Sequence, residues 1–440
     1  MLISKNNETR PTKLTFEVYS WAAMLFFLGL LTHLVGTSAS VAGPLSVLFQ
    51  PLAGSLHAAA LLVLVSTPLH RRWLSGYFLS NPWMLCSLIV ILASTLWSID
   101  AAVTARRSLL VVGTTLTGLA IGFVYARFDY LGFLRRAFLV FIALSFLVAV
   151  FLPEYGVHHG DPEHEGRWRG LLSFKNQMAW MVALFLIFWL SRVRWRSLLR
   201  PAEAAPIALG AFTLVMCGSA TGLLQAAFGI FLLFLLRTYA EKRSLRLPIL
   251  LLSAAAILAM ALLGQVLLSA YLEATSRTDT LSGRTVIWAE VWPYILQRPL
   301  LGYGQSAFWE DPSRFFGNSY WISAAHHSHN AYIEVLLDLG IVGLSFQILF
   351  LVSLFRSLWR QMRSGSSDAA ALFAALAAIV VASMAGAMFF RPNSGIWVLI
   401  SSISGYAYAC QHYRPGAPNM VTATDGCPPV KLQETNADVI

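Results

Sequence analysis

The residues best suited to chemistry form a short histidine-rich stretch between two apolar parts of the chain. The stretch reads His326-His327-Ser328-His329. Asn330 and a long apolar run follow directly. A neutral imidazole accepts a proton from a hydroxyl group and releases it later, so this stretch is suited to acid–base catalysis. Because an apolar run follows, the stretch is expected at the mouth of a helix, whose N-terminal end attracts negative charge.

Two alternative interpretations of these histidines remain open. They can form a polar cap at the start of the following helix. They can also bind a metal ion, because His326 and His329 are three positions apart and an earlier polar stretch adds His158, His159 and His164. The chain has no HExxH motif and few carboxylates near the cluster, so we expect neither a metal ion nor another cofactor.

A second polar stretch, residues 163–176, concentrates the cations Arg167, Arg169 and Lys175 before an apolar run. Arginine binds a diphosphate with two donors at once and lysine binds it as a point charge. Trp168, between the two arginines, can lie at the lipid headgroups or stack on a sugar. No P-loop or GxGxxG motif is present. Phosphate chemistry without a nucleotide motif or metal ligands indicates a lipid diphosphate, whose departure needs charge stabilisation and a base for the attacking hydroxyl.

The composition shows which elements must position these groups. Hydrophobic residues make up 57% of the chain and charged residues 12%, which predicts an all-α integral membrane protein. The net charge of +10 fits cations retained on the cytoplasmic side, and we expect no nucleic-acid partner. Apolar runs predict about twelve spans of bilayer length. They lie near 17–36, 51–68, 82–98, 107–126, 137–152, 176–190, 204–218, 221–237, 247–268, 330–355, 369–390 and 394–410.

Basic residues follow every even-numbered span, which places both chain termini in the cytoplasm. The same rule places two long polar loops outside, at about 153–175 and 269–329, the second expected to be partly helical. Residues 1–16 then form a cytoplasmic N-terminus and 17–412 the membrane domain. The tail 413–440 is rich in Pro, Thr, Asp and Asn, and we expect it to be disordered.

The predicted spans are nearly free of ionisable groups. His33 and His57 lie within spans, each alone, and are better explained by packing than by a proton relay. Ion-coupled transporters usually carry charged groups near the bilayer midplane, so this pattern favours chemistry at the outer surface over transport. Cations at outer span ends, among them Arg106, Arg107 and Arg391, fit either an anionic ligand or snorkelling to the headgroups.

Three motifs give the chain a resemblance to a known family. Arg167-Trp168-Arg169-Gly170, with Lys175-Asn176 after it, looks like an Arg-x-x-Gly…Asn element. Ser282-Gly283-Arg284 and then Pro299-Leu300-Leu301-Gly302-Tyr303-Gly304 look like the start of a large periplasmic loop. His329-Asn330, nine further residues and Gly340-Ile341-Val342-Gly343 match a His-[Asn/Ser/Gln]-x9-Gly-x-x-Gly signature. On these motifs the chain resembles the bacterial O-antigen ligase and polysaccharide polymerase superfamily, and is most similar to its exopolysaccharide polymerase branch.

The resemblance implies an inverting, metal-independent glycosyl transfer at the periplasmic face of the inner membrane. The donor would be a glycan on undecaprenyl diphosphate. Arg167 and Arg284 would hold the diphosphate, with Arg169 and Lys175 beside them, and His329 would lie near the acceptor hydroxyl. The expected substrate-binding residues are His326, Asn330, Asn176 and Trp168.

Three hypotheses about the function remain, and the first two differ in the acceptor of the glycan. A polymerase extends exopolysaccharide by joining lipid-linked repeats, and this is the reading we favour. A ligase transfers the finished glycan to lipid A-core or to a protein, but here Leu344-Ser345 follows the last signature glycine, where the ligase signature often continues with Thr. A third hypothesis is a transporter of the lipid-linked glycan. Besides membrane lipids, a chain-length regulator or export proteins are possible partners.

Overall fold

The structure, a computed structural model, covers most of the predicted membrane domain. It describes residues 10–30, 46–126, 128–160, 164–241, 284–317, 327–386 and 388–412, together with 244, 248 and 251. The predicted span at 247–268, apart from residues 248 and 251, lies outside the described residues, as do Ser282-Gly283, His326 and the tail 413–440.

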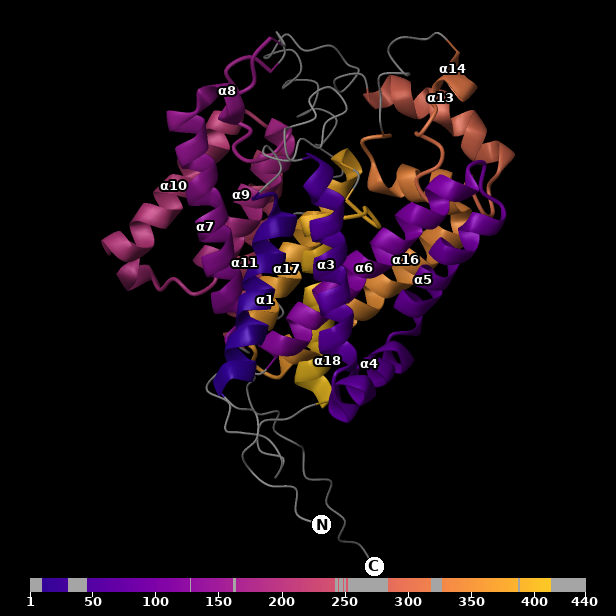
Figure 1. The fold of residues 1–440 in the computed structure, drawn as a ribbon. Helices are drawn as coiled ribbons and strands as arrows, with labels where there is room; N and C mark the ends of the chain where they lie inside the picture. Colours follow the sequence, from indigo (N-terminus) through magenta and orange to yellow (C-terminus); the bar gives the residue numbers. More distant parts are fainter. Residues whose placement is uncertain are drawn as a thin grey trace, which may run out of the picture.

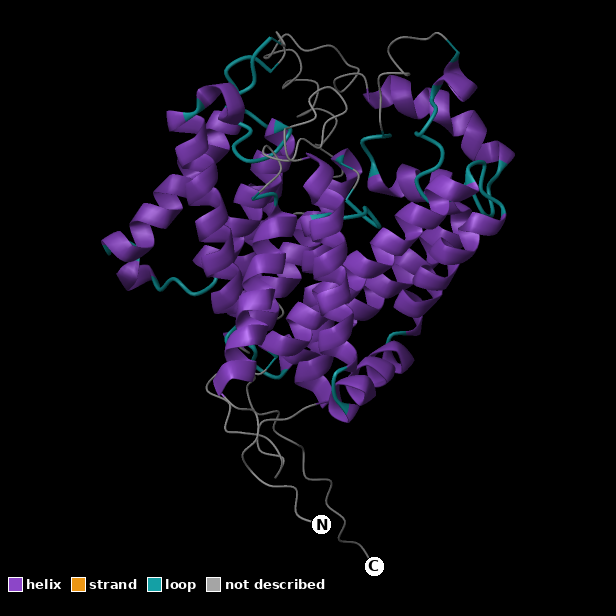
Figure 2. Ribbon diagram, viewed as in Figure 1, coloured by secondary structure: helices purple, strands orange, loops and turns teal. Residues whose placement is uncertain are grey.

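Helices make up nearly all of the described chain. They are α1 (Arg10–Leu28), α3 (Ser46–Val65), α4 (Pro68–Ser80), α5 (Pro82–Ala93), α6 (Ala101–Tyr125), α7 (Tyr130–Phe151), α8 (Pro153–Gly156), α9 (Lys175–Leu190), α10 (Pro201–Cys217), α11 (Ala220–Glu241), α13 (Arg284–Gln297), α14 (Ser313–Phe316), α16 (Ala331–Arg363), α17 (Ser367–Ala382) and α18 (Gly395–His412). Within these ranges the only extended pairing is an isolated bridge between Val157 and Trp168. The predicted all-α class is confirmed for the described residues (Figure 2).

Five of the described helices are long and apolar enough to cross a membrane, and a bent pair formed by α3 and α4 is a possible sixth span. Each predicted span except 247–268 overlaps a described helix. Several of these helices are shorter, among them Lys175–Leu190 and Pro201–Cys217. An integral membrane protein is therefore confirmed, and the count of about twelve spans stays a prediction.

Helix α4 was not predicted from the apolar runs. The chain bends by 101° between α3 and α4. Thr67 starts the new helix by accepting a hydrogen bond from the backbone N–H of His70, and Pro68 fits its first turn. Asn81 alone then separates α4 from α5, which begins at Pro82.

The core of the bundle depends on close approach of α6 and α18. A Cβ atom at Gly122 of α6 would lie 2.2 Å from the carbonyl oxygen of Ser402 on α18. One at Gly118 would lie 2.5 Å from the carbonyl oxygen of Val398. Small residues that let two helix backbones touch are typical of packing in membranes.

The two ends of the bundle carry different structures (Figure 1). Helix α1 begins and α18 ends at the lower end, where α4 also lies. Helices α8, α13 and α14 lie at the upper end. Both polar stretches singled out from the sequence therefore gather at one end of the bundle.

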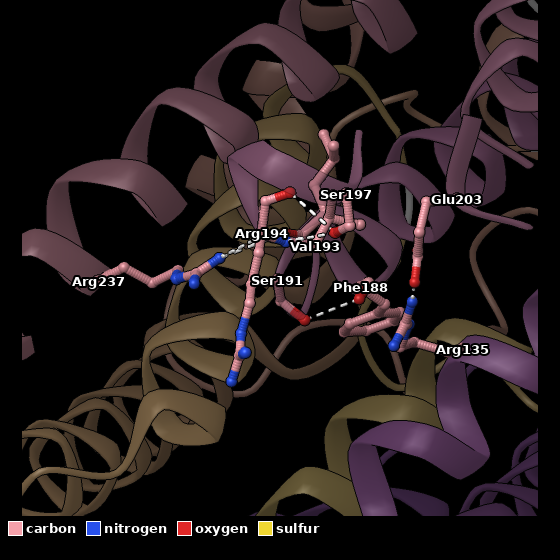
Figure 3. Close-up of polar contacts among 9 residues, drawn as sticks. Arg135, Phe188, Ser191, Val193, Arg194, Ser197, Glu203 and Arg237 are labelled. Atoms are coloured by element: carbon pink, nitrogen blue, oxygen red, sulfur yellow. Dashed lines mark hydrogen bonds and ion pairs between the residues drawn. The ribbon is translucent and has the colours of Figure 1, made fainter. Parts of the chain in front are cut away.

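Two cations near the connection from α9 to α10, Arg135 and Arg237, are held by the protein itself (Figure 3). Arg135 forms an ion pair with Glu203 at 3.2 Å. One guanidinium nitrogen of Arg237 donates to the carbonyl oxygens of Leu190 at 3.4 Å and Val193 at 3.3 Å. Such contacts satisfy carbonyl groups that a helix end leaves without partners.

Candidate active site

The segment 299–304 docks on α16 through backbone hydrogen bonds. The N–H of Tyr303 donates to the carbonyl of Leu337 at 2.8 Å, and the N–H of Gly304 to that of Asp338 at 2.9 Å. Gly302 and Gly304 both have positive φ, of 66° and 102°, which other residues rarely adopt. The glycines of this motif therefore allow a turn whose backbone packs directly against α16.

Gly340 of α16 forms the other side of this contact between α16 and segment 299–304, which we call the joint. It interrupts α16 with φ 62° and ψ −163°, and a Cβ there would lie 2.3 Å from the carbonyl of Leu300. The next N–H, of Ile341, donates to the carbonyl of Pro299 at 2.8 Å. The Pro299–Gly304 motif and the signature glycine Gly340 are thus two sides of one contact, which fixes α13 relative to α16.

His329 lies in a tight turn directly before α16, with a positive φ of 54°. One carboxyl oxygen of Glu334 accepts from the backbone N–H of Ser328 at 3.0 Å and from its hydroxyl at 2.8 Å. The same oxygen accepts from Trp309 Nε1 at 3.1 Å. Asn330 caps α16, and its side-chain oxygen accepts from the N–H of Tyr332 at 2.9 Å. The turn is therefore held from both sides of His329.

Helix α13 brings Arg284 to this turn. Trp288 Nε1 donates to the carbonyl of Ser328 at 2.8 Å, which ties the helix to the residue before His329. Arg284 is four positions earlier on α13 and so lies on the same face as Trp288. Arg284 is close enough for its charge to act on the His329 imidazole.

The electrostatics of this cluster favour a neutral imidazole. Burial, together with the positive charges of Arg284 and Arg391, lowers the pKa of His329 to about 4. Burial also lowers the pKa of Arg284. At neutral pH the imidazole is therefore unprotonated and can accept a proton, beside two cations that suit an anionic leaving group.

Arg391 was predicted only as one of several cations at outer span ends. Its segment is anchored by polar contacts from distant helices. The N–H of Asn393 donates to the hydroxyl of Thr114 at 3.0 Å, and its side-chain oxygen is 3.0 Å from Nε2 of His57. The side chain of Gln305 donates to the carbonyl of Phe390 at 3.2 Å. His57 thus helps to hold the segment that carries Arg391.

Arg167 belongs to a second cluster, formed by the loop before α9. It is exposed and lies over Gly218, where a Cβ would come within 2.6 Å of a guanidinium nitrogen. Trp168 is 8% exposed, and its ring packs against Phe146 and Phe212. Successive residues of an extended segment point to opposite sides, so Trp168 turns inward where Arg167 turns outward.

The other residues of this loop make contacts within it. Arg169 donates to the carbonyls of Tyr155 at 2.9 Å and Glu154 at 3.2 Å, and burial lowers its pKa. The buried Lys175 starts α9, and its N–H donates to His158 Nε2 at 3.1 Å. Arg169 and Lys175 therefore help to shape the loop that presents Arg167.

Asn176 accepts a hydrogen bond from the hydroxyl of Ser219 at 2.7 Å, which joins the start of α9 to the start of α11. His158 and His164 have ring centres 5.5 Å apart. Among the described residues, no three His, Cys, Asp or Glu side chains are arranged to hold a metal ion.

The two clusters are linked through the segment that carries Arg391. Gly386 packs against the ring of Trp180 on α9, where a Cβ would lie 2.3 Å from the indole. Phe389 meets the ring of Tyr332 in the first turn of α16, with ring centres 5.4 Å apart. His329, Arg284 and Arg391 form one cluster, and the loop of Arg167 forms a second one.

Comparison with known proteins gives two matches. Residues 205–348 match a family model described as O-antigen ligase, a range that includes Arg284, His329 and Gly340. The chain is also 28% identical over 241 residues to "Exopolysaccharide production protein ExoQ" of Rhizobium meliloti (strain 1021). That match covers 52% of this chain and 55% of the relative, about half the length of each. Together these matches confirm that the chain resembles the O-antigen ligase and polysaccharide polymerase superfamily, close to its exopolysaccharide branch.

Proposed function

We propose that this protein is a membrane glycosyltransferase that polymerises exopolysaccharide repeats from a glycan donor on undecaprenyl diphosphate. The observation that carries the proposal is the position of the His329 imidazole near the charges of Arg284 and Arg391, on a turn held by Glu334. This combination provides a base and a cationic site for a leaving diphosphate, the two groups that such a transfer needs.

The reaction is one displacement at the anomeric carbon of the donor sugar. The acceptor hydroxyl attacks that carbon while its proton passes to His329. The bond from the carbon to the diphosphate oxygen breaks, and the diphosphate leaves with the electron pair. Arg284 and Arg391 stabilise the charge that develops on it. A single displacement inverts the configuration of the carbon, and no step requires a metal ion.

The second cluster extends the cationic surface. Arg167 is exposed over Gly218, so its guanidinium is accessible to the diphosphate or to the first sugars of the donor. Arg169 and Lys175 support the loop around it, and the inward-facing Trp168 acts in packing.

Two alternative functions have different support from the comparisons and the structure. A ligase that transfers the glycan to lipid A-core or protein is supported by the description of the matching family model. Polymerisation is supported by the exopolysaccharide name of the relative. A transporter of the lipid-linked glycan is less well supported, because the candidate site residues gather at one end of the bundle.

The proposed topology places this end of the bundle in the periplasm and both termini in the cytoplasm, in the inner membrane of a bacterium. The start of α1 and the end of α18 lie at the end opposite α13, which supports a shared side for the termini. The proposed partners are membrane lipids and a chain-length regulator or export proteins.

The deciding experiment profiles the glycans of a deletion strain complemented with wild type, His329→Ala or His327→Ala. Secreted polysaccharide and lipopolysaccharide are analysed side by side. Loss of long secreted polymer with unchanged lipopolysaccharide supports the polymerase. Loss of the lipopolysaccharide ladder, with long glycan left on the lipid carrier, supports the ligase. A clear deletion phenotype that His329→Ala fully rescues refutes the site.

Arg284 and Arg314 provide a matched pair of cations. We expect Arg284→Ala to abolish transfer from purified donor, because its charge acts beside His329. Arg314→Ala should leave transfer within about twofold, because Arg314 is exposed and makes one long contact, 3.4 Å to the carbonyl of Ile99. Equal losses in the two variants would remove the leaving-group role of Arg284.

A further inference from the structure

A cavity of about 710 Å³ lies where α4 meets α5 and α18 ends, at the end of the bundle opposite α13 (Figure 1). It lies between the junction of α4 and α5, the C-terminal half of α16, α17 and the last turns of α18. Its volume is in the range of sites that hold small molecules. Its distance from His329 makes it a site separate from the transferase chemistry.

Two cations stand in the wall of this cavity. Arg356 and Arg360 are one helical turn apart on α16, and both are exposed. Neither side chain makes a hydrogen bond or ion pair with any residue that the structure describes, and no Asp or Glu is among the residues lining the cavity.

Three other cations of the bundle have partners within the protein. Arg192 contacts Asp129 at 2.6 Å and Asp368 at 2.7 Å. Arg135 and Arg237 are held by a carboxylate and by carbonyl groups (Figure 3). Arg356 and Arg360 thus differ from these three arginines in having charge available for a ligand within the cavity.

The remaining walls of the cavity are partly apolar and partly polar. Trp359 and Phe373 face each other with ring centres 6.0 Å apart. From α18, His412 and Tyr408 also line the cavity and are stacked with ring centres 4.2 Å apart. The cavity therefore offers cations together with aromatic surface, which suits an amphiphilic anion better than a small inorganic one.

The level of the cavity along the bundle also favours a lipid. Helix α4, which borders it, is turned by 101° from α3 and presents Arg71 and Arg72 to solvent. A short helix that crosses the bundle end with exposed arginines is typical of the headgroup layer. Basic cavities between helices at this layer bind lipid headgroups.

We propose that this cavity binds the phosphate-bearing headgroup of an anionic membrane lipid. Arg356 and Arg360 contact the phosphate, and the aromatic walls receive the glycerol and the start of an acyl chain. The site is separate from the proposed transfer reaction and does not depend on it.

The test uses the purified full chain in neutral detergent, with binding measured by native mass spectrometry and by titration. The probes are short-chain phosphatidylglycerol, short-chain phosphatidylcholine and inorganic phosphate. We expect one tight phosphatidylglycerol per chain, with weak binding of the other two probes. Each cation near an anionic headgroup contributes roughly a fivefold factor, so Arg356→Gln with Arg360→Gln should raise Kd about 30-fold.

The matched control is Arg71→Gln with Arg72→Gln, which removes the same charge at the same end of the bundle but outside the cavity. It should change Kd less than about twofold. Single substitutions at Arg356 or Arg360 should each raise Kd about fivefold, which keeps the test valid if the double variant unfolds. Equal losses in both double variants, or equal binding of the neutral lipid, would refute the site. Tight binding of inorganic phosphate would refute a lipid as the ligand.

Discussion

Glu334 is predicted to position His329 without contacting the substrate. One oxygen of its buried carboxyl accepts from the N–H and hydroxyl of Ser328 and from Trp309 Nε1, at 2.8–3.1 Å. Removing that oxygen leaves two N–H groups without an acceptor, each at about 1–3 kcal/mol. The left-handed conformation of His329, φ 54°, costs about 1–2 kcal/mol and persists only while the turn is held. The loss is therefore large enough to let the turn relax.

We expect Glu334→Ala to lower kcat about 100-fold, because a displacement of about 1 Å in a reacting group has an effect of that size. Glu334→Gln keeps an acceptor oxygen of similar reach and loses only the charge contribution, so its kcat should fall roughly tenfold or less. KM for the lipid-linked donor should change little, since Arg284 and Arg391 are intact. The assay is the initial rate of transfer from purified donor across a range of donor concentrations.

Glu290→Ala is the matched control, because Glu290 is an exposed carboxyl on α13 near the same end of the bundle. It should retain wild-type kcat. Glu334→Ala with kcat within threefold of wild type would contradict the role of the turn. Equal losses in Glu334→Ala and Glu334→Gln would show that the acceptor oxygen is not what matters.

Two further predictions concern the joint and the cations. Gly340→Ala should lower the unfolding temperature strongly, because the new Cβ would meet the carbonyl of Leu300 at 2.3 Å with φ at 62°. Gly54→Ala, with nothing within 4 Å of its Cβ, should be neutral or stabilising by up to about 1 kcal/mol, and a similar fall in both would contradict the joint. Arg391→Gln should raise the pKa of His329 from about 4 toward 6.5, because it removes a positive charge that disfavours the imidazolium. Activity of the free enzyme should then begin to fall at a higher pH as the medium is acidified, and an unchanged acidic limb of kcat/KM would refute the coupling.

Much of the fold is predictable because bilayer spans depend on the length of apolar runs alone. Helix α4 was not predicted, because its sequence mixes arginines, aromatic residues and serines, which do not form an apolar run. Its start was nevertheless visible in Thr67-Pro68, a capping residue followed by proline. The angle of 101° that it makes with α3 depends on packing, which local sequence does not report.

The candidate site was predictable only where its parts are close in sequence or carry a motif. Arg284 and His329 came from motifs, and the structure brings their charges together. Arg391 reaches the same cluster through contacts of its segment with α6 and α3, which no spacing along the chain encodes. Glu334 accepts from Ser328, two residues before the helix cap Asn330, and from the distant Trp309, and no local capping motif reports that pair of contacts.

The fixed spacing between His329-Asn330 and Gly340 has a geometric explanation. The nine residues between Asn330 and Gly340 form the first part of α16, which spans roughly 14 Å at 1.5 Å per residue. Gly340 is where the Pro299–Gly304 segment docks, and that segment closely follows α13, which starts at Arg284. The first part of α16 and helix α13 are therefore connected at this joint. His329 lies at the far end of the α16 segment, and Arg284 lies at the far end of α13. One residue added to α13 or to the first part of α16 would rotate the far end of that helix by about 100° and separate His329 from Arg284. The signature spacing thus sets the position of the chemical groups, although only its histidine takes part in the proposed reaction.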